Sequence, residues 1–512
     1  MPLRQQSAGI RVREILPDSQ FFGPNEAHIS SCTSDPNRCH RGSLFVAVQT
    51  SEEDGHTGVD QALNRGAAAV IAERYLPISA PLYVVPDSRE AYGQICHHLA
   101  GCPTDSLCTV GVTGTNGKTT TTQLIAAILR TAGCPTGVMN SLVYDDTDRR
   151  QPATCSTPAA HELARWLGRM RDNQCSHAVV EASSRGLAER RTAGMELDAA
   201  VLTNLRRDHL DFHQSIFNYR RAKARLFEHL KPGGFVVAHA DDPATRFLLR
   251  DIPHPVLTVG MRREAELSAR VVERHAGEQT FLLTAGDETV AVQTRMFGDH
   301  HVYNCLSAAA VGLLLGIDLV TVARGLESVT TIEGRMEPLV GGQPFGVYLD
   351  HAHTPDALAA TLKALRQVTT GRVLCVFAIP PDGDPSQRPL LGRVLERGAD
   401  AGVITGSGGK WQQVLPVAHE ILDGYDRPAK AHVLPDQAAA IRWMLGQAGP
   451  NDAVLIAAAP TPGTRNRKGK PDRSARQVAK RWLANVGSNI DYPQPPTKMA
   501  LLRTACHRLA VN

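Results

Sequence analysis

The sequence lacks several features that would assign it to common protein classes. It has no run of about eighteen apolar residues, which argues against a helix that spans a membrane. Its eleven cysteines include no Cys-x-x-Cys pair, so the ligand spacings of structural zinc are missing. No apolar stretch typical of a secretory signal follows the early arginines, and we therefore expect reduced thiols in the cytoplasm. The net charge of +4 is small for 512 residues and gives no indication of nucleic-acid binding.

The length and the order of apolar segments predict an α/β protein of about three domains. Strand and helix patterns alternate from residue 106 onward, which is typical of mostly parallel sheets covered by helices. We predict domains at 1–105, 106–335 and 336–490, with a tail at 491–512. The middle domain is expected to carry a parallel mononucleotide-binding sheet with an antiparallel appendage at 256–297, and the third domain an open Rossmann-like sheet.

Individual strands can be assigned from short apolar runs bounded by turn residues. In the middle domain, strands are predicted at Leu107–Val112, His177–Val180 and Ala199–Thr203, and a hairpin at Thr280–Thr284 and Thr289–Thr294. In the third domain, strands are predicted at Gly346–Leu349, Val373–Phe377, Gly402–Thr405 and Ala453–Ala457, with helices at 356–368, 389–398, 410–422 and 436–446.

The segment 111–122, Gly-Val-Thr-Gly-Thr-Asn-Gly-Lys-Thr-Thr-Thr-Thr, has the pattern of strand, glycine loop and helix start. The backbone N–H groups of such a loop bind phosphate, Lys118 reaches the outer phosphates, and Thr119 offers its hydroxyl to Mg²⁺. Val112 occupies the first position of the strict glycine pattern, so a plain structural turn is the alternative. We predict a phosphate loop that binds ATP.

Polar side chains follow the next two predicted strands, at the edge where ligands of parallel sheets gather. Glu181 ends one strand, and its carboxylate with the Thr119 hydroxyl would suit Mg²⁺. His209 follows the other strand and is by itself more typical of a surface histidine than of a metal ligand. Lys223 lies on an apolar stripe of the helix predicted after Ser215, together with Tyr219, Leu226, Phe227 and Leu230. It either extends its charge outward or is buried with a depressed pKa, and a neutral amine can add CO₂ to form a carbamate.

Taken together, these stretches resemble the Mur ligases, and among them the enzymes that add the third residue of the precursor peptide. The resemblance covers nearly the whole chain in order. It is carried by Gly42–Val48, Thr113–Thr120, Ser156–Pro158, Glu181–Arg191, Thr203–Phe227, Gly334–Glu337 and Asp350–Asp356.

The resemblance implies an ATP-dependent ligase of peptidoglycan precursor synthesis, with roles in cell-wall biogenesis, cell shape and cell division. Such an enzyme adds an amino acid to UDP-N-acetylmuramoyl-L-alanyl-D-glutamate through an acyl phosphate, uses ATP and Mg²⁺, and is expected to be monomeric. The implied catalytic residues are Lys118, Glu181, His209 and Lys223. The implied metal ligands are Thr119, Glu181, His209 and carbamylated Lys223. The implied nucleotide-binding residues are Gly114, Thr115, Asn116, Gly117, Lys118, Thr119, Thr120, Asn304 and Arg335. The implied dipeptide-binding residues are Ser156, Thr157, Ser183 and Arg191, and His353 matches a position near the interdomain hinge.

Several positions depart from the family pattern. Asp35-Pro36-Asn37 stands near the uridine pocket, Glu189 replaces a glutamine, and His301 replaces an asparagine near the adenine. The amino-acid recognition motifs are altered at 381–384, 407–410 and 458–462, so the sequence does not identify the amino acid. The basic run 465–470 either binds a carboxylate in their place or is a solvated loop.

Two other functions fit parts of this pattern. The first is a related ligase that acts on another acidic acceptor, as folylpolyglutamate synthetases do, although Ser183 and Arg191 argue against it. The second is a nucleotide-sugar-binding homologue that has lost its amine site and with it full activity. The altered motifs of the third domain motivate this second alternative.

Overall fold

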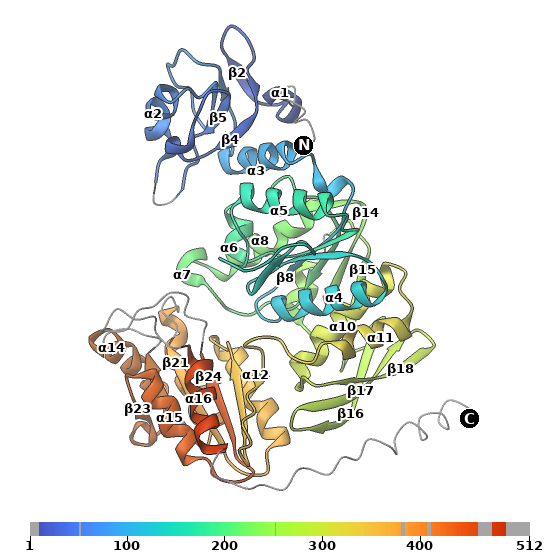
Figure 1. Ribbon diagram of the computed structural model, residues 1–512, viewed down its shortest axis with the longest axis vertical. Helices are drawn as coiled ribbons and strands as arrows, with labels where there is room; N and C mark the ends of the chain where they lie inside the picture. The colour runs from blue at the N-terminus through green and yellow to red at the C-terminus, as the bar shows by residue number, and fades with distance from the viewer. Residues whose placement is uncertain are drawn as a thin grey trace.

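The computed structural model describes residues 10–50, 53–250, 252–379, 384–406, 411–458 and 474–487. Three main sheets follow one another along the molecule, within residues 20–84, 108–294 and 337–457 (Figure 1). The expected α/β fold with three sheet-centred units is confirmed. The domain boundaries near 105 and 335 stay predictions; they agree with the positions in the chain at which one sheet ends and the next begins. The predicted tail at 491–512 lies outside the described residues.

The N-terminal unit is a five-stranded sheet of order β2-β7-β6-β5-β4. Its strands β4 to β7 run parallel to their neighbours, and β2 is antiparallel to β7. A separate two-stranded ribbon, β1-β3, pairs beside it. The strands are β1 Ile10–Arg11, β2 Gln20–Phe22, β3 His28–Ile29, β4 Ser31–Thr33, β5 Ser43–Val46, β6 Ala69–Ala72 and β7 Leu82–Val84, and the helices are α1 Val12–Ile15, α2 Val59–Asn64 and α3 Ser88–Leu99.

The middle sheet has eleven strands in the order β11-β10-β9-β12-β8-β13-β14-β15-β16-β17-β18. Neighbours from β9 to β16 are parallel, whereas both ends of the sheet are antiparallel. The central strands are β8 Cys108–Thr113, β9 Thr136–Met139, β12 His177–Glu181, β13 Leu197–Leu202, β14 Leu230–His239 and β15 Val256–Gly260. The end strands are β10 Val143–Asp145, β11 Arg150–Pro152, β16 Leu267–His275, β17 Glu278–Ala285 and β18 Glu288–Thr294.

The antiparallel appendage predicted at 256–297 is present as β16, β17 and β18, with the hairpin of β17 and β18 as expected. Only β15 differs from the prediction, because it is parallel to both β14 and β16 and joins the appendage to the main sheet. Val259 and Gly260 of β15 pair in parallel with Leu267 and Ser268 of β16, so one continuous hydrogen-bonded sheet includes both parts.

Helices cover both faces of the middle sheet. One face packs against α4 Lys118–Thr131, α10 Asp299–Leu314 and α11 Leu319–Ser328, and the other against α5 Ala160–Asp172, α6 Ser184–Ala188 and α8 Ile216–Ala224. Because both faces are covered, the strands carry apolar side chains on both sides. Their sequences are therefore continuous short apolar runs, which is why the sequence predicts them. The shorter helices α7 Leu210–His213 and α9 Pro243–Leu248 lie in the connections between strands.

The third sheet has the order β19-β20-β24-β21-β22-β23, parallel except for β19. Helices α12 to α14 pack on one face and α15 and α16 on the other. The strands are β19 Glu337–Pro338, β20 Gly346–Asp350, β21 Val373–Ile379, β22 Ala401–Gly406, β23 His432–Val433 and β24 Ala453–Ala457. The helices are α12 Pro355–Val368, α13 Arg388–Gly398, α14 Trp411–Leu422, α15 Gln437–Gln447 and α16 Ala475–Gly487. The expected Rossmann-like arrangement is confirmed.

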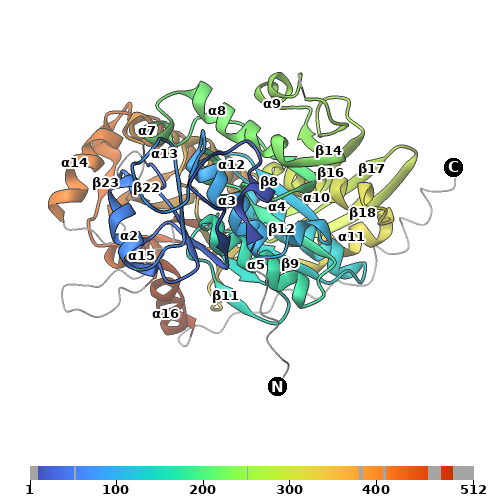
Figure 2. The same cartoon turned by 90° about the horizontal axis from the view of Figure 1, so that it is seen from above.

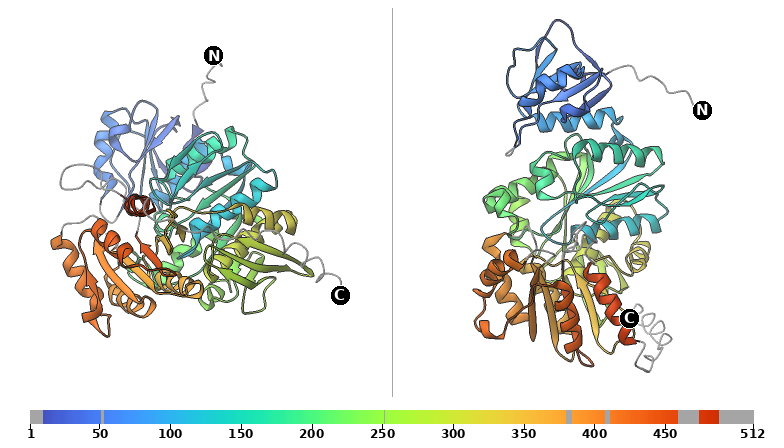
Figure 3. Two further views of the ribbon diagram at one scale, coloured as in Figure 1. Left: turned by 60° about the horizontal axis from the view of Figure 1, so that its bottom comes forward. Right: turned by 60° about the vertical axis from the view of Figure 1, so that its left-hand side comes forward.

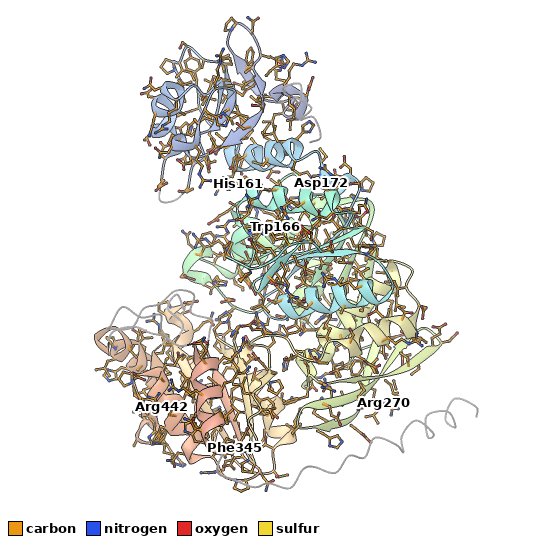
Figure 4. The ribbon with its side chains drawn as sticks, in the orientation of Figure 1. His161, Trp166, Asp172, Arg270, Phe345 and Arg442 are labelled. Carbon is orange, nitrogen blue, oxygen red and sulfur yellow. The ribbon has the colours of Figure 1, made fainter. Side chains whose placement is uncertain are left out.

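The N-terminal and third units lie at opposite ends of the molecule, with the middle unit between them, as Figure 1 and the right-hand view of Figure 3 show. Seen from above, along the long axis, the N-terminal unit overlaps the units behind it (Figure 2). Helices α3 and α5 form the N-terminal junction, where the Tyr92 hydroxyl lies 3.1 Å from Nδ1 of His161 (Figure 4). Among the described residues, no helix combines the length and the apolar character that a bilayer crossing requires.

Candidate functional site

The loop between β8 and α4 has the backbone geometry of an anion cradle. Gly114 and Gly117 have φ angles of +143° and +87°, which residues with a side chain rarely adopt. A Cβ at Gly114 would clash with the Thr203 hydroxyl, and one at Gly117 with Oδ1 of Asn304. The loop therefore passes too close to its neighbours for any residue other than glycine, and α4 begins directly after it at Lys118.

Residues that follow β13 hold this loop in place. The Thr203 hydroxyl donates to the Asn116 carbonyl at 2.6 Å, and Asn204 both donates to that carbonyl at 2.9 Å and accepts from the Asn116 N–H at 3.0 Å. The Thr115 hydroxyl lies 2.7 Å from the hydroxyl of Tyr219 on α8. The cradle is thus fixed before any ligand binds, which lowers the ordering cost of binding.

Two lysines from different helices meet at one carbonyl. Lys118 Nζ donates to the carbonyls of Gly114 at 3.1 Å and Thr115 at 2.8 Å, and Lys223 Nζ donates to Gly114 at 2.6 Å. Lys223 is only 1% exposed. Burial, and to a lesser extent the neighbouring Lys118 charge, hold the pKa of Lys223 well below its ordinary value. Burial also lowers the pKa of Lys118. The alternative of a lysine extending into solvent is therefore wrong for Lys223.

The helical stripe that carries Lys223 is shorter than expected. Helix α8 ends at Ala224, a 3₁₀ segment spans Arg225–His229, and Leu230 already belongs to β14. Tyr219 and Leu226 are nevertheless buried on the same side as Lys223. The predicted apolar face is therefore correct, and only the predicted helix length is wrong. The 3₁₀ turn that replaces the end of the helix keeps these side chains directed inward.

Thr119 and Glu181 form a buried polar pair. The Thr119 hydroxyl donates to Oε2 of Glu181 at 2.8 Å, and the Ser141 N–H donates to the same oxygen at 3.1 Å. Arg335, which follows the middle domain in the sequence, donates from Nη2 to the Thr119 hydroxyl at 3.1 Å. A hydroxyl and a carboxylate oxygen side by side, 2% exposed in each case, are the ligand types that a hard cation such as Mg²⁺ prefers.

His209 lies near this pair without a direct contact to it. Its Nε2 lies 3.5 Å from Oδ2 of Asp208, and its side chain is 51% exposed. Partial desolvation of the ring lowers the pKa of His209, the Asp208 charge opposes this, and the Lys118 charge adds to it. Among the hydrogen bonds and ion pairs of the described residues, none joins His209 to Thr119 or Glu181.

The four positions assigned to dipeptide binding come from three segments: Ser156 and Thr157 precede α5, Ser183 lies between β12 and α6, and Arg191 follows α6. The Thr157 hydroxyl donates to the Glu181 carbonyl at 2.9 Å and accepts from the Ser183 N–H at 2.9 Å. Arg191 donates to the Thr157 carbonyl at 2.7 Å and to Glu189 at 2.8 Å, and Ser156, half-buried, precedes Thr157. The structure therefore brings these residues together, and the Glu189 carboxylate partly neutralises Arg191.

A cavity of about 390 Å³ adjoins the loop at the boundary of the middle and third units. It is lined by Asn116 and Gly117 of the loop, by His301 and Asn304 of α10, and by Arg335. Its position beside the phosphate cradle fits the sugar and base of a nucleotide. His353 lies outside this lining, and its Nδ1 lies 2.8 Å from the His351 carbonyl oxygen.

Two residues of the site were missed by sequence reasoning. Ser141 lies two residues after the end of β9, and polar residues that follow a central strand are a usable signal. The Tyr219 hydroxyl gave no signal, because the residue was read only as part of an apolar stripe. Residues 381–383, 407–410, 459–462 and 465–470, which bear on amino-acid recognition, lie outside the described residues.

A phosphate cradle, the half-buried Lys118 beside the buried Lys223, and a hydroxyl–carboxylate pair define a nucleotide-binding α/β protein of the phosphate-loop class. Residues 112–312 match the Mur ligase middle domain, and residues 334–459 match the Mur ligase, glutamate ligase domain. The chain belongs to the Mur ligase family, as its similarity to full-length relatives also shows.

Two curated relatives and one solved structure illustrate this similarity. The UDP-N-acetylmuramoyl-L-alanyl-D-glutamate--2,6-diaminopimelate ligase of Geobacillus kaustophilus (strain HTA426) is 37% identical over 430 residues, 83% of this chain and 88% of the relative. The UDP-N-acetylmuramyl-tripeptide synthetase of Roseiflexus sp. (strain RS-1) is 34% identical over 474 residues, 87% of this chain and 93% of the relative. A solved structure of a UDP-N-acetylmuramoyl-L-alanyl-D-glutamate--2,6-diaminopimelate ligase has 26% identity and a TM-score of 0.67, covering 94% of this chain and all of that one.

Proposed function

We propose that this Mur ligase joins an amino acid to UDP-N-acetylmuramoyl-L-alanyl-D-glutamate in an ATP-dependent reaction of peptidoglycan precursor synthesis. The observation that carries the proposal is the Thr119–Glu181 pair beside Lys118, in a chain 37% identical to a ligase named for that substrate. A phosphate donor bound in the cradle and a dipeptide bound by Thr157, Ser183 and Arg191 would meet at this pair, because Thr157 also bonds to the Glu181 carbonyl.

The chemistry proceeds in two displacement steps. A carboxylate oxygen of the dipeptide attacks the γ-phosphorus of ATP, a carbon–oxygen–phosphorus linkage forms, and ADP leaves. The amine of the incoming amino acid then attacks the acyl carbon, loses a proton and expels phosphate. Several anionic oxygens must approach one another in the first step, and the loop N–H groups and the Lys118 ammonium offset their repulsion.

We also propose that Thr119 and Glu181 hold one Mg²⁺, and that Lys223 as a carbamate and His209 hold a second. When bound, Mg²⁺ supplies Lewis-acid polarisation of the phosphoryl oxygens. The oxygen ligands of the first site fit this ion. For the second site, the buried Lys223 amine has a depressed pKa, which favours the neutral form that adds CO₂. His209, with its lowered pKa, offers a neutral ring nitrogen.

We place the protein in the cytoplasm as a monomer with roles in cell shape and cell division. The ten cysteines of the described residues are all free, in keeping with a reducing compartment. Diaminopimelate is the first amino acid to test, because relatives at 37% and 32–34% identity are named as its ligases. Lysine and ornithine belong in the same panel, because the recognition motif at 407–410 departs from the family pattern.

Purified protein, ATP, Mg²⁺ and the UDP-dipeptide, incubated with each amino acid and analysed by mass spectrometry, test the proposal. Lys118→Ala is expected to reduce turnover by about 10²–10³-fold, and Lys480→Ala, an exposed change on α16, to leave it unaltered. Phosphate release with another acidic acceptor, and none with the dipeptide, would favour the ligase of different specificity. Binding of nucleotide and dipeptide without turnover of any amino acid would favour the non-catalytic homologue.

The carbamate is tested separately. Removal of dissolved CO₂ is expected to lower the rate, and bicarbonate is expected to restore it. The Lys223→Ala variant should be inactive and insensitive to both treatments. A wild-type rate that does not depend on CO₂ would contradict the role of Lys223 as a carbamate while leaving the ligase reaction itself intact.

A further inference from the structure

A second cavity of about 520 Å³ lies between α12 and α13 of the third unit. The catalytic proposal does not use this groove. Its lining comes from two turns of each helix and consists of Ala359, Leu362, Lys363, Arg366, Gln367, Arg393, Val394, Arg397 and Gly398.

The floor of this groove is apolar and its rim is cationic. Ala359, Leu362 and Val394 supply aliphatic side chains, and the missing side chain of Gly398 lets α13 approach Leu362 closely. Four of the nine lining residues are Lys or Arg, and none is Asp or Glu. The chain as a whole has 55 basic and 51 acidic residues, so a lining whose charged residues are all basic differs from the composition of the chain.

Two of the four rim cations are paired and two are not. Arg366 pairs with Asp400 and Arg397 with Asp426, both outside the lining. Lys363 and Arg393, exposed and on facing helices, form no ion pair with any other described residue. The groove therefore has two uncompensated positive charges on opposite sides of an apolar floor.

We propose that the α12–α13 groove is a docking site for an acidic, amphipathic peptide segment of a partner protein. Carboxylates of such a segment would pair with Lys363 and Arg393, and its apolar side chains would cover Ala359 and Val394, the accessible aliphatic side chains of the lining. A small inorganic anion would satisfy the charges and leave the floor exposed, and a purely apolar segment would leave the charges unpaired. Only an occupant with both properties matches both parts of the surface.

The groove shares a helix with the nucleotide cavity. Asp356, Ala357, Ala360 and Thr361 of α12 line that cavity, whereas Ala359, Leu362, Lys363 and Arg366 on the opposite side of the helix line the groove. Gln367 at the groove also accepts a hydrogen bond from Arg274, which bonds at 2.6 Å to Asp299 at the start of α10. Docking and nucleotide binding therefore act on the same helix, and any coupling between them must be reciprocal.

The test uses the full chain and two fluorescent synthetic peptides. The first is an acidic peptide whose leucines recur every three to four residues, and the second has serine at those leucine positions. The first peptide is expected to bind, and the Lys363→Glu/Arg393→Glu variant to bind it about tenfold more weakly. The matched control is Arg442→Glu/Lys480→Glu, which makes the same charge change on α15 and α16, the opposite face of the sheet (Figure 4). This control should bind like the wild type.

Three results of the peptide-binding measurements would overturn the proposal. They are equal binding of the leucine and serine peptides, equal loss of binding in both double variants, and complete competition by millimolar inorganic phosphate. A dimer seen by sedimentation that Lys363→Glu/Arg393→Glu dissociates would assign the groove to a second copy of the chain and would also overturn it. All these measurements are independent of ligase activity, so failure here leaves the proposed reaction untouched.

Discussion

The hydroxyl of Thr119 and the carboxylate of Glu181 are joined by a hydrogen bond of 2.8 Å, although 62 positions separate them in the chain. The bond links the first turn of α4 to the end of β12, which is the direct neighbour of β8 in the sheet. Because these two strands are parallel, the loop after one and the last residue of the other meet at a single edge. This edge is where the proposed reaction takes place.

Replacing Glu181 with glutamine tests the metal role of this pair. The amide oxygen of the new side chain can still accept from Thr119 and Ser141, so the fold should survive while the negative charge is lost. We expect the Mg²⁺ concentration for half-maximal rate to rise by about tenfold or more. Steady-state rates over a magnesium titration measure the change. Glu288→Gln, an exposed change at the start of β18, is the control, and an unchanged titration in Glu181→Gln would contradict the assignment.

Tyr219→Phe tests whether α8 positions the phosphate loop. The substitution removes the hydroxyl that lies 2.7 Å from the Thr115 hydroxyl and keeps the ring that lies 4.8 Å from Lys223 Nζ. Loss of one hydrogen bond of about 1 kcal/mol predicts an ATP KM about fivefold higher, with the KM of the dipeptide unchanged. An equal rise of both KM values, or a large drop in Tm, would indicate a general structural defect instead.

Arg191→Ala tests the dipeptide site. Arg191 donates to the Thr157 carbonyl and is 27% exposed, so its guanidinium has room to reach an anionic ligand. We expect the KM of the UDP-dipeptide to rise by about tenfold or more and that of ATP to stay the same. Arg221→Ala, an exposed change on α8, should alter neither value. If Arg191→Ala affects only ATP, the site has been placed wrongly.

His97, near the N-terminal junction, makes the free energy of unfolding depend on pH. The ring is buried, its Nε2 lies 2.8 Å from the Thr104 hydroxyl, and burial lowers its pKa to about 4, against the opposing Asp105 charge. Between pH 6.5 and 4 the unfolded chain binds a proton at this residue and the folded chain does not, so stability falls with falling pH, by about 3 kcal/mol over the whole interval.

Denaturant unfolding from about pH 7 to about pH 4 measures this effect. The free energy of unfolding of His97→Gln should depend less steeply on pH than that of the wild type, because one titrating group is gone. His275→Gln, whose parent side chain is 65% exposed, serves as the control and should keep the wild-type slope. Identical slopes in wild type and His97→Gln would show that His97 is not the group responsible.

The elements that sequence reasoning found are those in which nearby residues decide the structure. The third domain shows this best: Ala453–Ala457 was predicted with the bounds that β24 has, and the four predicted helices match α12 to α15 within a residue or two. Continuous apolar runs of β-branched residues and helical spacing of leucines act over one element at a time. The phosphate loop is readable for the same reason, because strand, glycines and helix start are adjacent in the chain.

The sequence-based predictions were wrong where contacts between distant segments determine the structure. Residues 256–297 alternate in a hairpin pattern, but that pattern does not reveal that β15 and β16 pair in parallel and extend the main sheet. Helix α8 gives way to a 3₁₀ turn at Arg225, since Leu226 and Phe227 pack into the core beneath the sheet. Each of these outcomes depends on packing partners that no local window contains.

Short-range periodicity and motif spacing in the sequence are enough to identify the element types, the phosphate loop and the family. The burial of Lys223 against the Gly114 carbonyl, the convergence of Ser141 and Arg335 on Thr119 and Glu181, and the position of α12 between two cavities became visible only in the fold. These are contacts between segments tens to hundreds of residues apart. Their geometry is fixed by sheet order and by the packing of helices on both faces, which exist only once the chain has folded.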